Sequence, residues 1–376
     1  MAVRDSQYGS STVGDVIREY RKARGITQKQ LACELGVEAR TLRMYENGER
    51  ALENITDLRR IADLLAIDPA EFGLAARKHD AYTTKQVHEV VERVGSLILQ
   101  ARFVEARTTI DTLFRNLKKQ LGNEDPLFLR ALAYVHCIAG HVQAITCRTR
   151  EVEHMIRHFQ EMAQIAHTLE DQSLLNIALS YHGDMLRRRG EFAQAIVYLE
   201  KARENTPLAD AAARGNNALL LGRAHLGNKD YSSFEREMAC AERIARTVDT
   251  AADNTDNTLT LFSLGTVYEE YGRSYGKMGK LEKSLHYLQL AEMHLPANNL
   301  WSTLLKAARA EALIHAGEIA DAMPILIEVA HHAQMYGHQR LIERLYRLQY
   351  YLDDQASLMR QASRSLSDAL HGPIEY

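Results

Sequence analysis

The chain has 376 residues with 46 Lys+Arg and 49 Asp+Glu, which gives a formal net charge of −3 at pH 7. Hydrophobic residues make up 46% and charged residues 25%, an ordinary composition for a folded protein with more than one domain. No apolar run approaches the roughly 18 residues that a membrane span needs, and the first residues lack the apolar region of a signal peptide, so we expect a cytoplasmic protein with no membrane partner.

Two short helices joined by a tight turn are the first predicted elements. Thr27 is a typical N-cap residue, and the helix that follows it ends before Gly36. A second helix is predicted over 38–47, where Leu42 and Tyr45 stand three residues apart and face inward. Two helices about a glycine turn are the helix-turn-helix motif.

This segment resembles the phage-repressor class of DNA-binding domains, also called Cro/C1 or XRE type. The resemblance is carried by residues 26–32, 36–37 and 45–50 and covers roughly 12–75. It implies a five-helix lambda-repressor-like domain that binds a double-stranded DNA operator. Because residues 1–75 carry a net charge near zero, we expect a homodimer to compensate for weak binding by one domain.

The resemblance also implies which residues contact DNA. Phosphates are held by the start of the second helix and the flanks of the third, and exposed residues early in the third helix read bases. Arginine at a reading position suits guanine, so we expect a G-containing half-site. In this family Arg21 and Glu46 form a structural pair. The implied DNA-binding residues are Gln28, Lys29, Ala39, Arg40, Thr41, Arg43, Met44 and Asn47.

Helical spacing continues to the end of the chain, which has only six prolines, and it predicts an all-α protein. A fourth helix is predicted over 54–66, with a short fifth helix after it. The sequence therefore divides into a DNA-binding domain over 12–75, a linker over 76–86 and a regulatory and dimerisation domain over 87–372.

The third region repeats a pattern of small and aromatic residues that is typical of tetratricopeptide (TPR) repeats. We expect about seven helical pairs that stack into a TPR-type right-handed α-solenoid, with a capping pair over 339–370 and an inserted polar loop over 247–258. The clearest copies of the pattern are centred on Gly183, Gly222, Gly272 and Ala310.

In such repeats the first helix of each pair lines a concave groove. The side chains at the groove positions, among them Ser180, mix arginine, amide, hydroxyl and acidic groups. Amides can pair with a peptide backbone and arginines with its carboxylates. The predicted peptide-binding residues are Arg130, Tyr134, Asp184, Arg187, Asn216, Arg223, Glu269 and Arg273.

Other chemistry is weakly indicated. Four widely spaced cysteines contain no C-x-x-C pair, which argues against a zinc site or a disulfide framework. His154 and His158 lie four residues apart without a third ligand, so we interpret them as ordinary surface or core histidines. We predict no cofactor, no metal site and no catalytic set, and therefore a protein that is not an enzyme.

An XRE domain followed by TPR repeats resembles the RRNPP-type peptide-sensing quorum regulators, the group of Rgg, PlcR, PrgX and NprR, with the arbitrium receptors as relatives. The resemblance implies a transcriptional regulator in which a short signalling peptide switches DNA binding by shifting the dimer between two arrangements. Two alternatives stay open. The repeats dock a protein partner or only dimerise, without a peptide, or they bind a response regulator while the helix-turn-helix is vestigial.

Overall fold

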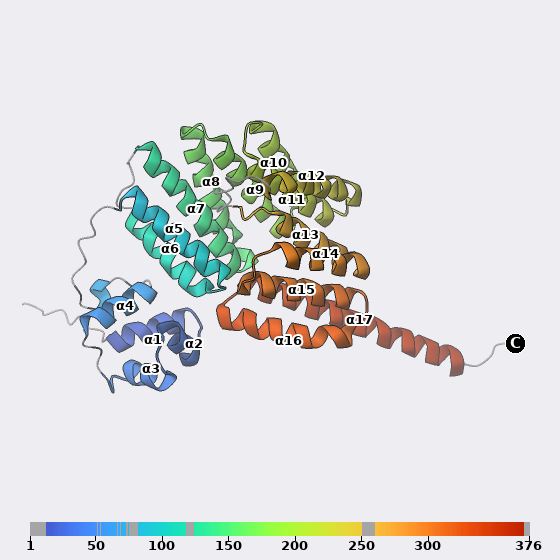
Figure 1. Cartoon of the computed structure of the whole chain (residues 1–376). Helices are drawn as coiled ribbons and strands as arrows, with labels where there is room; N and C mark the ends of the chain where they lie inside the picture. The colour runs from blue at the N-terminus through green and yellow to red at the C-terminus, as the bar shows by residue number, and fades with distance from the viewer. Residues whose placement is uncertain are drawn as a thin grey trace, which may run out of the picture.

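The structure is a computed structural model that describes residues 13–50, 52, 54–65, 67, 69–72, 74, 82–117, 124–249 and 260–371. All regular elements in these residues are helices, which confirms the all-α prediction. Figure 1 shows a small N-terminal domain below a larger curved array of helices, and a long last helix that projects from the array. Within these ranges, no helix combines the length and apolar character needed to cross a membrane.

The N-terminal domain packs four α-helices around one core. Ile17, Leu31, Leu42 and Ile61 come from different helices and are at most 1% exposed. The predicted fifth helix is a single 3₁₀ turn. The elements are α1 (Val13–Ala23), α2 (Gln28–Leu35), α3 (Ala39–Glu46), α4 (Ile55–Leu65) and η1 (Pro69–Phe72).

Local hydrogen bonds fix the ends of α2. The Thr27 hydroxyl accepts from the backbone N–H of Gln30 at 3.2 Å, and the Gln30 side chain accepts from the N–H of Thr27 at 2.8 Å. This reciprocal pair is a capping box. At the other end Gly36 adopts a left-handed φ of 66°, which a residue without Cβ reaches easily. The predicted helix-turn-helix boundaries are therefore confirmed.

The larger part, residues 84–371, is called the repeat domain below. Within the described ranges it contains six helical pairs, and the two members of each pair contact each other. The pairs are α5 (Thr84–Leu99) with α6 (Phe103–Leu117), α7 (Pro126–Thr146) with α8 (Val152–Thr168), α9 (Gln172–Arg188) with α10 (Phe192–Asn205), α11 (Ala211–Gly227) with α12 (Tyr231–Asp249), α13 (Leu264–Lys277) with α14 (Leu281–His294), and α15 (Asn299–His315) with α16 (Ile319–Tyr336).

Small residues lie where the paired helices cross, as the repeat pattern predicts. A Cβ added at Gly183 would lie 2.8 Å from Leu199 Cγ, and one added at Gly272 would lie 2.7 Å from atoms of Leu288. Real Cβ atoms do not approach so closely, so a larger residue would push the helices apart. The glycine spacing in the sequence therefore identified real helix crossings.

Two expectations about the repeat domain need correction. The first helix begins at Thr84, because Thr83 and Gln86 form a second capping box, so the linker expected over 76–86 ends earlier. Residues 339–371 form one helix, α17 (Gln339–His371), and not a capping pair. The reason is that this segment contains no glycine or proline before residue 372. Most of the loop expected over 247–258 lies outside the described residues, and α12 continues to Asp249.

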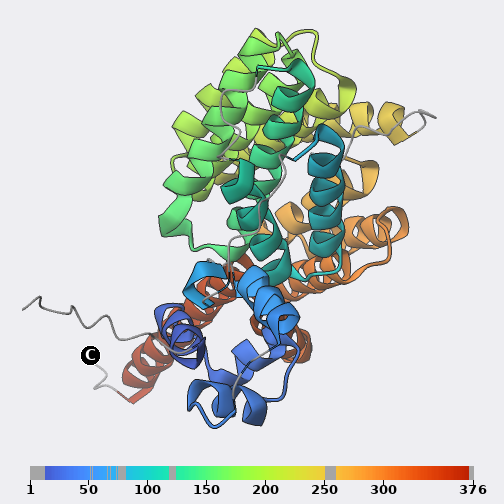
Figure 2. The same cartoon turned by 90° about the vertical axis from the view of Figure 1, so that its left-hand side faces the viewer.

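The two domains meet through α4 and α6, which contact each other. Figure 2 shows the N-terminal domain directly below the first helices of the repeat domain. The N-terminal part of α17 packs against α16 and α7, so it closes the array by joining its last pair to its second.

Candidate functional site

A buried ion pair holds the recognition helix in place. The Glu46 carboxylate is 2% exposed and accepts from Arg21 Nε at 2.6 Å and from Arg21 Nη2 at 2.9 Å. Gln28 Nε2 donates to the same carboxylate at 2.8 Å. Burial alone would raise the pKa of Glu46, but the hydrogen bonds from Arg21 and Gln28 lower it overall. This group joins the end of α1, the start of α2 and the end of α3.

The residues implied for DNA binding lie on α2, on α3 and just after α3, mostly on the surface. Thr41 and Met44 are half-buried beside the exposed ones. Gln28 is also half-buried, and its amide is already used by Glu46, so it links α2 to α3 in this structure. The exposed members of the set are Lys29, Ala39, Arg40, Arg43 and Asn47.

A cavity of about 1260 Å³ occupies the concave side of the repeat domain. It is lined mainly by the first helices of the pairs, α5, α7, α9, α11, α13 and α15, together with the start of α17. Small-molecule pockets usually measure roughly 300–1,000 Å³, so this cavity has room for a larger, extended ligand. The prediction that first helices line a hollow agrees with this arrangement.

One charged group on the cavity floor is centred on Asp184. Its carboxylate accepts from Arg187 Nε at 2.7 Å and from Arg188 Nε at 3.0 Å. Burial would raise the pKa of Asp184, but Arg187, Arg188 and Arg223 together hold it well below its usual range. This carboxylate stays ionised and has little capacity left for a ligand.

A second charged group is centred on Glu270. Arg223 and Arg273 both donate to its carboxylate, and the Ser274 hydroxyl donates at 3.2 Å. Burial opposes ionisation, but the two guanidinium groups lower the pKa of Glu270 far below its ordinary value. Arg273 Nε has no hydrogen bond among the described residues, since Glu269 Oε1 lies 3.9 Å away.

The last helix adds arginines that the sequence analysis did not select. Arg344 Nε donates to Glu311 on α15 at 2.9 Å, and Glu343 accepts from the backbone N–H of Thr149 at 3.0 Å. Arg340 lies one turn earlier and also lines the cavity. The only available signal was the spacing of Arg340, Arg344 and Arg347 on one face of a helix.

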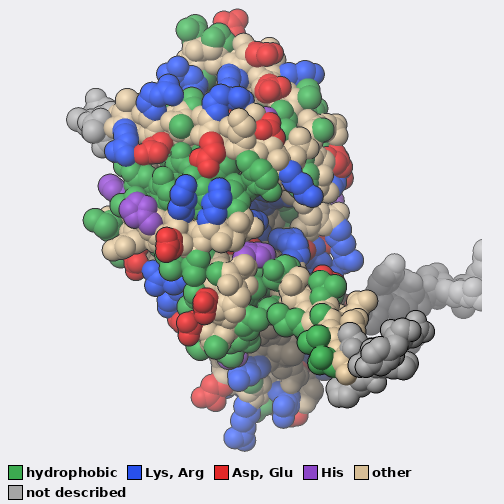
Figure 3. All heavy atoms as spheres, turned by 90° about the vertical axis from the view of Figure 1, so that its right-hand side faces the viewer, with side chains coloured by type: hydrophobic (Ala, Val, Ile, Leu, Met, Phe, Trp, Pro, Cys, Tyr) green, Lys and Arg blue, Asp and Glu red, His purple; other side chains and the backbone are tan. Residues whose placement is uncertain are grey.

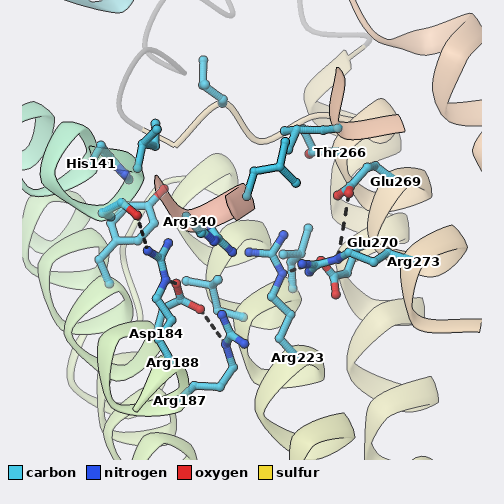
Figure 4. Close-up of a pocket in the computed structure, with 18 of the residues that line it drawn as sticks. His141, Asp184, Arg187, Arg188, Arg223, Thr266, Glu269, Glu270, Arg273 and Arg340 are labelled. Atoms are coloured by element: carbon cyan, nitrogen blue, oxygen red, sulfur yellow. Dashed lines mark hydrogen bonds and ion pairs between the residues drawn. The ribbon is translucent and has the colours of Figure 1, made fainter. Parts of the chain in front are cut away.

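Within the part of the chain that the structure describes, two arginines of the cavity lining, Arg340 and Arg347, have neither a hydrogen bond nor an ion pair, whereas Arg187, Arg188, Arg223, Arg273 and Arg344 are all paired. Arg347 is exposed, and Arg340 is half-buried. Figure 4 shows it directed into the space between Arg188 and Arg223. The positive charge of Arg188, followed by burial, lowers the pKa of Arg340 well below its usual range. Burial also lowers the pKa of Lys277, at the edge of the same group, to about 8.

The lining as a whole is positive, with nine Lys or Arg side chains against six Asp or Glu. Apolar side chains fill the space between these charges. They include Trp301 and Leu304 from α15 and Leu219 and Leu220 from α11. The cavity can therefore hold a ligand that carries both negative charge and apolar groups.

Seven of the eight predicted peptide-binding residues line the cavity, and Arg130 does not. Arg130 lies near the start of α7 and forms an ion pair with Asp171 at 2.5 Å. Ser180 was also expected in the groove, but it is fully buried between helices. There its hydroxyl accepts from Asn217 Nδ2 at 2.9 Å. The residues that the cavity brings together are Tyr134, Asp184, Arg187, Asn216, Arg223, Glu269 and Arg273.

His154 and His158, four residues apart on α8, have different surroundings. His158 Nδ1 lies 3.2 Å from Nδ1 of His136, and burial lowers the pKa of His158 to about 4 and that of His136 to about 3. His154 instead contacts Arg157 on the helix surface. Within the described ranges, no three His, Cys, Asp or Glu side chains gather as a metal site would require.

Comparisons with known proteins identify the N-terminal domain. Residues 17–72 match a family model described as "Helix-turn-helix". The chain therefore carries an XRE-type helix-turn-helix DNA-binding domain, built on the residues whose geometry is given above. No curated protein matches the chain.

Among solved structures, the chain is similar to PlcR of Bacillus thuringiensis, which was crystallised in complex with the peptide PapR7 and DNA. The two share 16% sequence identity with a TM-score of 0.38. The match covers 74% of this chain and 95% of PlcR.

Proposed function

We propose that this protein is a sequence-specific transcriptional regulator, a homodimer whose repeat domain binds a short linear peptide that switches binding to an operator. The helix-turn-helix domain supplies the DNA-binding half of this function. The observation that supports the peptide half is Arg340, a guanidinium that points into the cavity without a hydrogen bond or ion pair among the described residues.

An unpaired arginine in a confined site is energetically unfavourable. Removing an ionised group from water costs several kcal/mol unless a partner charge compensates it. Arg188 repels Arg340, and Asp184, which attracts it, already accepts hydrogen bonds from Arg187 and Arg188. A carboxylate placed beside Arg340 would compensate its charge with charge-assisted hydrogen bonds and would offset the repulsion from Arg188, which is already paired with Asp184. The ligand that best suits this position is therefore anionic.

The rest of the lining favours a peptide as the carrier of that anion. The Asn216 amide can pair with a peptide backbone, while Trp301 and Leu304 offer apolar contact for side chains. Folded partner proteins usually dock over a broad surface and bury roughly 800 Å² of each partner. A charged hollow of this volume is a better fit for a flexible segment than for a protein domain.

The switch follows from where the lining residues originate. A ligand that contacts α9, α11, α13 and α17 together binds one curvature of the array more tightly than others. That difference in affinity sets the largest possible shift between two arrangements of the dimer. The repeat domain then moves the helix-turn-helix domain through the contact of α4 with α6.

The test is recovery of the ligand. We expect protein purified from its native host to release peptides with at least one carboxylate when denatured in acid, detected by mass spectrometry. The variant Arg340→Ala should lose them. The matched control Arg130→Ala, which also removes a predicted groove arginine but one outside the cavity, should retain them. If Arg340→Ala and the native protein release the same molecules, or neither releases a peptide, the peptide proposal is wrong and repeats that only dock a protein or dimerise are favoured.

A further inference from the structure

The C-terminal half of α17 presents an apolar face to solvent. Leu358, Met359, Leu366 and Leu370 are between 52% and 70% exposed. Figure 1 shows that this part of the helix leaves the body of the repeat domain. Figure 3 shows hydrophobic side chains gathered at the lower right of the face from which the helix projects. Monomeric proteins rarely expose several large apolar side chains on one helix.

This face continues a seam that the chain already uses internally. Leu341 and Leu348 are buried against α15 and α16, and Leu345 and Leu352 pack beside them. These four residues follow alternating steps of four and three residues, which is the spacing of a coiled-coil seam. The same steps lead onward to Gln355, which is half-buried, and to Met359, Ala362 and Leu366, which are exposed. We call these last four residues the distal seam.

The distal seam carries no charge, although charged residues are frequent in this part of the helix. Asp353, Asp354, Arg360 and Arg364 all occupy positions away from the seam. An uncharged apolar seam can face an identical one without repulsion, as a symmetric dimer requires. The small side chain of Ala362 allows two helices to approach closely at that position.

We propose that the distal seam of α17 pairs with the same segment of a second copy of this chain and forms the dimer interface. The observations favour a second copy as the partner. The seam is uncharged, so two identical seams can meet without repulsion, and it continues the seam by which α17 packs against α15 and α16. It also fits helix-turn-helix domains, which bind two half-sites as two-fold dimers. The choice of a second copy as the partner rests on the homodimer of the proposed function. The test of the interface uses neither DNA nor peptide.

The test measures the mass of the full-length protein in solution by sedimentation equilibrium. We expect a dimer for the native chain and at least a hundredfold weaker association for the double variant Met359→Glu with Leu366→Glu. Ser357→Glu introduces the same residue on the opposite, exposed face of the helix and should leave the dimer intact. Glutamate favours helix, so far-ultraviolet circular dichroism and the fluorescence of Trp301 should stay unchanged in both variants.

A second measurement locates the contact. Ala362→Cys places a thiol on the seam, and we expect oxidation to cross-link two copies, whereas Ser357→Cys should give no covalent dimer. A native chain that sediments as a monomer would overturn the inference, as would a double variant that dimerises as strongly as the native chain. The sedimentation masses do not depend on peptide or operator binding, so the dimer interface and the proposed function can fail separately.

Discussion

Substituting Arg21 by Ala would break the ion pair that holds the recognition helix. The change leaves the Glu46 carboxylate buried without its guanidinium. Breaking a buried pair on one side costs about 3–5 kcal/mol. Two features of the structure reduce this figure: the Arg21 side chain is 18% exposed, and Gln28 still donates to Glu46 at 2.8 Å. We therefore expect a loss of about 2–3 kcal/mol, a large part of the stability of a domain this small.

Hydrogen exchange measured by mass spectrometry can follow this loss in the full-length chain. A loss of 2–3 kcal/mol corresponds to exchange roughly 30- to 160-fold faster at the amides of α2 and α3, with the repeat domain unaffected. The double variant Arg21→Met with Glu46→Leu removes both charges, so it should recover most of the protection. If Arg21→Ala exchanges within twofold of the native domain, or the double variant is as unstable as the single one, the pair does not hold the recognition helix.

Three further outcomes are expected. Arg40→Ala and Arg43→Ala should each weaken operator binding by about 1–3 kcal/mol, or roughly 5- to 160-fold, in fluorescence-anisotropy titrations at fixed salt; unchanged affinity in both would favour a vestigial helix-turn-helix. Burial lowers the pKa of His136 and of His338 to about 3, so the folded state binds fewer protons than the unfolded state below about pH 6.5. Stability should therefore fall as the pH drops, by about 1.4 kcal/mol per histidine at pH 5.5, and a melting temperature that is constant from pH 7 to 5.5 would contradict this. Phe234→Ala removes a fully buried ring and should cost the repeat domain about 3–5 kcal/mol, measured by urea unfolding with the single tryptophan as reporter; a loss below about 1 kcal/mol would show that this core is loosely packed.

Local signals in the sequence were sufficient for the DNA-binding domain. The Thr27 cap, the Gly36 turn and the inward position of Leu42 all act within about twenty residues, and the structure places each as expected. The repeat domain was predictable for a similar reason, because each helix crossing needs a small residue such as Gly183 at a fixed distance from its partner.

The chemistry of the cavity was only partly predictable. Repeat spacing placed Asp184 at the hollow, but it could not show that Arg188, which follows four residues later, would neutralise it. Ser180 was predicted to line the groove from the same repeat helix as Asp184. Its partner Asn217 lies 37 residues away, and only the folded packing turns the hydroxyl into the core. Arg340 was missed because the docking of α17 depends on contacts with α7 and α16, and no local pattern encodes such contacts.

A single uninterrupted helix connects the arginines of the cavity with the apolar residues at its far end. At 1.5 Å per residue, the distance along α17 from Arg340 to Leu366 is about 39 Å, so a tilt of only about 5° at the cavity would displace the far end by about 3 Å. A ligand carboxylate that draws two guanidinium groups together could therefore tilt α17 at the cavity. The tilt would move the far end of the helix by several ångströms and shift the two copies of the dimer relative to each other. The spacing of their DNA-reading helices would then change without any rearrangement inside either recognition domain.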